Sequence, residues 1–175
     1  MTVESRNFAA TIPISSIIFR WDGIFDFDGL YSFIQSWIAN REYEFHEKSY
    51  KQKPEIDKIG EHIELKWYGE RKVTEYVMNR IDMHMHAWNV EKVELDGKIL
   101  TKARLWIQIN STLILDWQEK WGRNSFFRYL RDFFNEYIVK KDIDLKWGED
   151  LRLETNKFLE DIKAYMNSMA RGKVY

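Results

Sequence analysis

Hydrophobic and polar residues alternate over several segments between residues 14 and 115, and this period of two predicts β-strands. The clearest strand lies within residues 98–115, where alternate positions give an apolar face of Ala103, Leu105, Ile107 and Ile109. The opposite face carries Arg104, Trp106, Gln108 and Asn110. We predict further strands at 14–21, 43–53, 63–68, 73–88 and 89–95, with a bend in 73–88 and a hairpin turn at Asp96-Gly97. A change in the alternation near Ser111 predicts a bulge or bend.

Apolar residues recur at helical spacing in three other segments. The first follows the first strand, begins at a capping Asp26 or Asp28, and ends near Asn40. The second is the aromatic-rich segment 125–141, whose stripe consists of Phe126, Leu130, Phe133 and Tyr137, and we expect this broad apolar face to pack on the sheet. The third stripe runs to Met169, and near Gly148 either two helices meet or one helix is kinked.

This order of elements predicts an α+β fold, in which a curved antiparallel sheet of about six or seven strands grips a long C-terminal helix. One helix follows the first strand. We expect residues 1–12, which are polar and small, to form a flexible N-terminus, and residues 13–175 to form a single domain. A chain of 175 residues can bury a core without disulfides or a structural metal.

Two segments, WDGIFDFDGLYSFIQSWI and FFRYLRDFFNEYIVKK, flank a strand meander with a DG hairpin. Together they resemble the START-like (SRPBCC, polyketide-cyclase-like) helix-grip domains, and more narrowly uncharacterised archaeal members of that group. The resemblance covers roughly residues 14–165 and rests on element order and aromatic patterning. It implies a cavity between the sheet and the long helix, where many relatives bind a hydrophobic small molecule. The chain differs in having one early helix where two are usual, and in carrying many large rings that could fill such a cavity.

Composition narrows the function classes. Hydrophobic residues make up 45% of the chain and aromatic residues 16%, which indicates a folded protein with a core of large rings. Lys and Arg number 27 against 28 Asp and Glu, so the net charge gives no reason to expect nucleic acid or anionic lipid as a partner. The absence of cysteine excludes disulfides, thiolate metal sites and Cys nucleophiles.

The chain shows no signal-peptide pattern and no apolar run of membrane-span length, so we expect a cytoplasmic protein.

The sharpest candidate chemistry is the group Asp82, His84 and His86. Positions two apart in a strand point to the same face, so a carboxylate and two imidazoles would lie together. These are suitable ligands for zinc or iron, and His62 or His46 could add an imidazole if the sheet order brings either one near. The ordinary alternative is a solvated strand face, and apart from this possible zinc or iron site we expect no cofactor.

A second charged pattern consists of Glu61, Glu64, Lys66, Glu70, Arg71 and Lys72 together with Arg104. Triphosphate tunnel enzymes hold metal and phosphate with interleaved acids and bases inside a barrel, but the spacing EHIELK departs from their alternating pattern. Cross-strand charge pairing on a wet sheet face is the simpler interpretation.

The interpretation we favour is a non-enzymatic binding module for an apolar small molecule or lipid, held in a cavity between the sheet and a C-terminal helical segment, beneath residues 125–141. Trp88, Trp106 and Phe133 would shape this cavity, and His84, His86 and Arg104 would supply its polar contacts. One alternative is an interaction or assembly subunit with a closed core, whose exposed aromatic residues meet another protein or a second copy of the chain. Another is a metal-dependent enzyme centred on Asp82, His84 and His86.

Overall fold

Five long strands pair in an antiparallel sheet whose order is β2-β3-β4-β5-β1, with the short strand β6 added at the free edge of β1. The computed structural model describes residues 10–54, 60–95, 97–121, 124–138, 140–169 and 171–174, and from 169 onward it describes the backbone alone. The strands are β1 Ala10–Phe25, β2 Glu44–Pro54, β3 Glu61–Lys72, β4 Val77–Leu95, β5 Lys98–Leu115 and β6 Arg171–Val174. The predicted flexible N-terminus falls largely on residues 1–9, outside the described residues, and β1 already begins at Ala10.

The sheet has fewer long strands than the predicted six or seven because the two predicted segments 73–88 and 89–95 belong to one strand, β4. The bend falls at Asn89, whose φ is 54°, where the pairing with β5 shifts between Trp88 and Glu91. An extra residue in one strand produces this kind of shift and lets a long strand turn without ending.

The predicted irregularity near Ser111 is wrong for β5, because Ser111, Leu113 and Leu115 all continue the buried face of that strand. The register shift lies in the partner strand instead. Pro13 pairs with Thr112 and Ser15 pairs with Ser111, so the extra residue belongs to β1. The local irregularity is therefore close to the predicted place but on the neighbouring strand.

Helix α1, Phe27–Asn40, follows β1 as predicted, and its buried residues are the predicted stripe Leu30, Ile34, Trp37 and Ile38. The carboxylate of Asp26 caps it by accepting a hydrogen bond of 2.8 Å from the backbone N–H of Gly29. The C-terminal helical region contains α3 Lys140–Asp142, the π-helical segment η2 Ile143–Gly148, and the long helix α4 Glu149–Met169. Gly148 is required at that junction, since a Cβ there would lie 2.9 Å from the carbonyl oxygen of Ile143.

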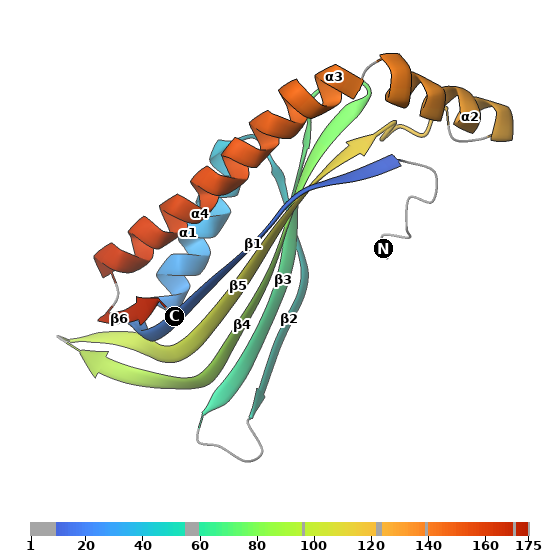
Figure 1. The fold of residues 1–175 in the computed structure, drawn as a ribbon. Coiled ribbons are helices and arrows are strands. Elements are labelled where there is room, and N and C mark those ends of the chain that lie inside the picture. Colours follow the sequence, from blue (N-terminus) through green and yellow to red (C-terminus); the bar gives the residue numbers. More distant parts are fainter. Residues whose placement is uncertain are drawn as a thin grey trace.

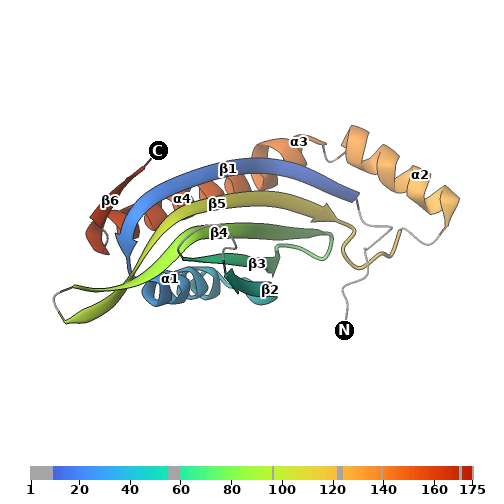
Figure 2. The same ribbon diagram turned by 90° about the horizontal axis from the view of Figure 1, so that it is seen from below.

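Helices α1 and α4 cover the same face of the sheet (Figures 1 and 2). Phe158 of α4 is fully buried between two tryptophans, with its ring centroid 4.2 Å from that of Trp37 on α1 and 6.1 Å from that of Trp67 on β3. The rest of the covered sheet face is made of alternate residues of β4 and β5, among them Met83, Met85, Leu105 and Ile107. An antiparallel sheet with a helix after its first strand and a long C-terminal helix packed on it is compatible with a helix-grip arrangement.

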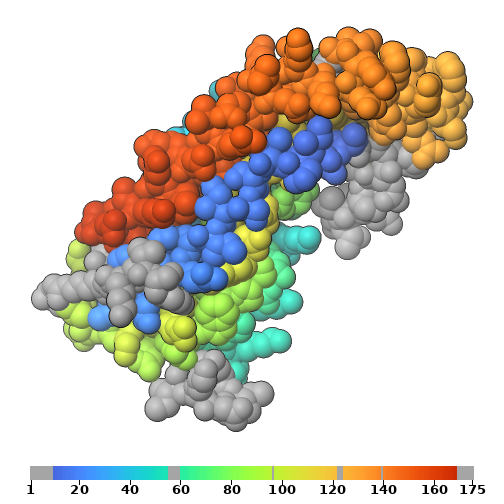
Figure 3. All heavy atoms as spheres, viewed as in Figure 1, coloured from blue at the N-terminus to red at the C-terminus, as the bar shows by residue number. Residues whose placement is uncertain are grey.

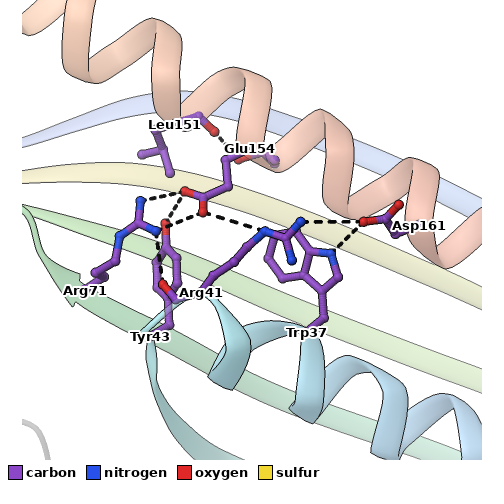
Figure 4. Close-up of polar contacts among 8 residues, drawn as sticks. Trp37, Arg41, Tyr43, Arg71, Leu151, Glu154 and Asp161 are labelled. Atoms are coloured by element: carbon purple, nitrogen blue, oxygen red, sulfur yellow. Dashed lines mark hydrogen bonds and ion pairs between the residues drawn. The ribbon is translucent and has the colours of Figure 1, made fainter.

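A half-buried polar network fixes the position of α4 at the end of α1 (Figure 4). The carboxylate of Glu154 accepts two hydrogen bonds from Arg71 of β3, at 2.9 and 2.8 Å, and a third of 2.8 Å from the hydroxyl of Tyr43. Two turns further along α4, Asp161 accepts a 2.9 Å hydrogen bond from the indole of Trp37. Burial raises the pKa of Tyr43, and the neighbouring Glu154 charge adds to the rise, so the phenol stays protonated and remains a donor.

The helix expected to pack on the sheet, residues 125–141, does not do so. It forms α2 Ser125–Phe133 and the π-helical segment η1 Phe134–Ile138, which extend beyond the ends of β1 and β5 (Figures 1 and 2). Phe126 is 65% exposed and Tyr137 is 68% exposed, whereas Arg131 is buried. One face of the sheet is already covered by α1 and α4, and the α2–η1 segment projects past the strand ends instead of packing on that face.

None of the described helices is both long enough and apolar enough to cross a membrane.

Replacing Phe158 by Ala is expected to lower the free energy of unfolding by roughly 3–5 kcal/mol, because it would leave a cavity between Trp37 and Trp67. Lys163→Ala, at an exposed position of the same helix, is the matched control and should change stability by less than about 0.5 kcal/mol. Urea unfolding followed by circular dichroism measures both. A loss below about 1 kcal/mol for Phe158→Ala would contradict the packing of α4 on the sheet.

Candidate metal-binding site on the outer face of the sheet

The face of the sheet opposite α1 and α4, here named the outer face, carries the even-numbered residues of β4 from Arg80 to Trp88 and those of β5 from Arg104 to Asn110. The odd-numbered residues from Ile81 to Ala87 are buried under the helices, so the residues between them must point the other way. No described helix covers the outer face (Figures 1 and 2). Its central residues are half-buried by one another, and their side chains remain accessible from solvent.

Three side chains on this face bring potential metal-binding atoms together. One ligand atom each from Glu64, His84 and His86 lies within 4.8 Å of the other two. Glu64 of β3 pairs directly with His86 of β4, and the next pair on the same face joins Lys66 to His84. Nε2 of His84 lies 3.2 Å from Oε1 of Glu64. The two strands therefore build a cluster of one carboxylate and two imidazoles that neither strand supplies alone.

His62 adds a third imidazole beside this cluster. Its Nε2 lies 2.9 Å from Nδ1 of His86, so one ring donates a hydrogen bond and the other accepts it. The rings are nearly parallel, with an interplanar angle of 10°. This contact uses one nitrogen of His86, holds the ring in place and leaves Nε2 outside the contact. Orientation of a metal-ligating imidazole through its second nitrogen is a common feature of metal sites.

Two tryptophans extend the imidazole cluster into a continuous aromatic surface. Trp88 stacks on His86, with centroids 5.2 Å apart and an interplanar angle of 6°, and it also stacks on His62. Trp106 of β5 lies 5.5 Å from His86 and meets His84 edge-on at 5.6 Å. The two indole rings thus lie directly against the imidazoles of the cluster.

The environment favours the metal-binding protonation states of these three residues. Lys66, whose Nζ lies 2.6 Å from Oε1 of Glu64, lowers the pKa of that carboxyl to about 2. Burial lowers the pKa of both His84 and His86, and the positive charge of Lys66 adds to the effect on His84. At neutral pH the carboxylate is therefore ionised and the imidazoles are neutral, which are the forms that bind metal ions.

Asp82, predicted as the carboxylate of a metal group, is not part of this cluster. Both of its oxygens accept 2.9 Å hydrogen bonds from the guanidinium of Arg80, two residues earlier on the same face. Glu64 provides the carboxylate of the cluster instead of Asp82, because the β3–β4 register places Glu64 directly across from His86. His46, the other imidazole considered, stacks on Tyr68 at 4.9 Å and lies 3.5 Å from Glu44.

The residues predicted to line a ligand cavity fall into two places. His84, His86, Trp88, Arg104 and Trp106 all lie on the outer face, with Trp88 paired to Arg104 and His86 paired to Trp106. They face away from α4, so the predicted cavity between the sheet and the C-terminal helix is not lined by them. Phe133 is on α2, where it is 44% exposed and packs against Tyr137.

The second charged pattern is divided between the two faces of β3. Glu64 and Lys66 lie on the outer face, whereas Arg71 binds Glu154 on the helix side. These charges therefore do not surround one barrel interior. His62, considered as an added imidazole, does lie beside His86. The contribution of Glu64 was missed because it depends on the β3–β4 register; the alternation in EHIELK was the available signal that His62 and Glu64 share a face.

A small cavity of about 290 Å³ lies at the other end of the molecule, against the helical segment that follows β5. Its apolar wall is formed by Ala10, Ile12, Leu115 and Ile143. Its polar residues are Asp132, Asn135, Glu136, Lys140 and Asp144. The cavity therefore combines an apolar wall with three carboxylates and one ammonium group.

No protein-family model matches the chain, and a search of curated proteins finds no match.

The two half-buried imidazoles provide a test of the outer-face geometry. In an NMR titration of the folded protein, His84 and His86 should protonate at a lower pH than the ordinary value of 6.5. A pKa depressed by folding contributes stability that is present above the ordinary pKa and lost as the pH falls through the folded-state value. Lys66→Ala removes a positive charge and should move the pKa of His84 upward. A pKa of His84 at or above 6.5 in the wild type would contradict this burial and charge arrangement.

Proposed function

We propose that the protein binds a divalent transition metal ion on the outer face of its sheet, with Glu64, His84 and His86 as ligands. The observation that carries the proposal is the placement of the three ligand atoms within 4.8 Å of one another by two paired strands. With metal–ligand bonds of about 2.0–2.2 Å, a tetrahedral site has ligand atoms roughly 3.3–3.6 Å apart. The 3.2 Å between His84 and Glu64 already matches one edge of such a site.

The donor set narrows the choice of ion. Two imidazole nitrogens and a carboxylate oxygen suit Zn²⁺, and the same set suits Fe²⁺, whereas Mg²⁺ and Ca²⁺ prefer oxygen donors alone. Three protein ligands leave a fourth position for water or for an atom of a bound molecule. His62 supports the site from outside, through its contact with Nδ1 of His86.

Lys66 opposes cation binding because its ammonium group already occupies Oε1 of Glu64. The Lys66 side chain is 39% exposed, and its flexible side chain can turn into solvent when a metal ion binds that oxygen.

The displaced ammonium group would then lie at the rim of the site, where it and Arg104 would favour an anionic second ligand. Trp88 and Trp106 offer that ligand flat apolar surfaces on which to stack. The proposed function is thus metal-assisted binding of a small anionic molecule with a planar part.

Isothermal titration of metal-free protein with Zn²⁺ is expected to give one bound ion per chain. His84→Ala and His86→Ala each remove a ligand and should weaken binding roughly 100-fold or more, while His62→Phe keeps a ring and should weaken it about 10-fold. His46→Ala is the matched control, since His46 binds Tyr68 and Glu44 instead. Absence of Zn²⁺ binding by the wild type, or equal loss in His46→Ala, would contradict the proposal.

A second candidate function, small-molecule carriage, is favoured by the 290 Å³ cavity near α3. The resemblance to START-like helix-grip domains points in the same direction, although this cavity lies against residues 132–144 instead of under α4. Three carboxylates against one ammonium favour a ligand with an apolar part and a cationic group.

Native mass spectrometry of the purified protein tests this second candidate. Carriage predicts a population with the added mass of an organic molecule, and Ile12→Trp, which fills the apolar wall, should remove it. Lys163→Ala serves as the control and should retain the added mass. Wild-type protein without any organic adduct, or an adduct unchanged in Ile12→Trp, would contradict a carrier function for this cavity.

A further inference from the structure

Helix α2 and segment η1 are oriented with their apolar side toward solvent. We name this side the aromatic stripe; its residues are Phe126, Phe127, Tyr129, Leu130, Phe133, Tyr137 and Ile138. Their exposed fractions range from 37% for Leu130 to 72% for Tyr129. In Figure 3 the surface of this segment forms the upper right corner of the molecule, beyond the end of β1. The stripe is therefore a projecting apolar surface and not part of the core.

Polar contacts on the inner side hold the segment in this orientation. The hydroxyl of Tyr76 donates a 2.5 Å hydrogen bond to the side-chain oxygen of Asn135, and Arg131 is only 7% exposed. Phe134 is the aromatic residue that turns inward, where it meets Tyr76 edge-on at 6.2 Å and stacks on Trp121 at 5.8 Å. Rotating the helix to bury the stripe would break all of these contacts.

A helix as short as α2 gains little stability from its own backbone hydrogen bonds, although Asn124 caps it by accepting a 2.9 Å bond from the N–H of Phe126. Helices of this length are normally stabilised by burying their apolar side. Here that side is exposed in a single chain, so the helix needs a partner surface to gain that stabilisation.

The size of the stripe matches what a stable dimer buries. The seven exposed fractions add up to about four complete side chains. At roughly 200 Å² for each large side chain this is on the order of 800 Å². The largest apolar patch on an ordinary monomer is about 300–600 Å², whereas a stable interface buries about 800 Å² on each partner.

Charge favours a second copy of this chain over a lipid surface as the occupant. Between Ser125 and Ile138 the charged residues are Arg128, Arg131, Asp132 and Glu136, which balance to zero. Helices that lie on membranes are rich in Lys and Arg on their polar side, and this segment lacks that excess. The stripe itself carries no charge, so two copies can meet across a two-fold axis without burying an ion.

We propose that the protein forms a homodimer in which the aromatic stripes of two chains pack against each other across a two-fold axis. This interface lies at the opposite end of the sheet from the connection between β4 and β5 (Figure 1) and does not involve the metal ligands. Dimerisation and metal binding are therefore separable properties.

Sedimentation equilibrium of the full chain over a range of concentrations tests the proposal. The wild type should have twice the chain mass of 21.3 kDa at micromolar concentration. The double variant Tyr129→Glu, Tyr137→Glu places charges in the stripe and should be monomeric, with dimer affinity lowered at least 100-fold and an unchanged circular dichroism spectrum. Phe126→Ser is a milder second variant and should weaken the dimer at least 10-fold without adding charge.

The matched control is Ile18→Glu, which places a glutamate at an exposed apolar residue of β1, outside the stripe, and should remain dimeric. A wild type that stays monomeric at all concentrations would overturn the proposal, and so would a dimer that persists in both stripe variants. Co-sedimentation with vesicles of phosphatidylcholine and phosphatidylserine provides the last comparison. A wild-type monomer that binds these vesicles, with binding lost in the double variant, would assign the stripe to lipid and contradict the dimer.

Discussion

The docking of α4 across the sheet is the interaction on which the rest of the structure depends. Phe158 enters between Trp37 and Trp67, and Glu154 fixes the helix to Arg71 and Tyr43. Large buried rings supply most of the stabilisation, and the bidentate carboxylate–guanidinium pair makes the position of the helix specific. Because α1 and α4 cover one face of the sheet, the strand pleat directs every second residue of β4 and β5 to the other face. The chemistry of the outer face follows from this division.

Register then decides which outer-face residues meet. The β3–β4 ladder places Glu64 across from His86, and it brings His62 within hydrogen-bond distance of the same ring. If the pairing slipped by one residue, these polar side chains would point into the core and its apolar residues would face solvent. The resulting loss of folding free energy strongly disfavours such a slip. The packing of apolar residues under α4 therefore maintains the spacing of the imidazoles and the carboxylate on the far side of the same strands.

Local patterns predicted the parts of the fold that depend on local sequence. Asp26 caps α1 and the stripe from Leu30 to Ile38 is buried, as helical spacing indicated. The shared face of His84 and His86 also followed from alternation alone. Glu64 could not be selected over Asp82, because the choice depends on β3–β4 register and on the Arg80 contact that occupies Asp82. The outward orientation of Phe126 and Tyr137 was missed because an amphipathic stripe shows which residues share a side, and not whether that side meets the chain's own sheet or solvent.

X-ray absorption at the zinc edge, recorded on protein loaded with one equivalent of Zn²⁺, tests the central claim most directly. Coordination by Glu64, His84 and His86 predicts two imidazole nitrogens and at least one carboxylate or water oxygen at about 2.0–2.2 Å. The imidazole scattering should fall by half in His86→Ala and stay unchanged in His46→Ala. A spectrum with oxygen ligands alone, or imidazole scattering that survives in a His84→Ala, His86→Ala variant, would contradict a metal site on the outer face.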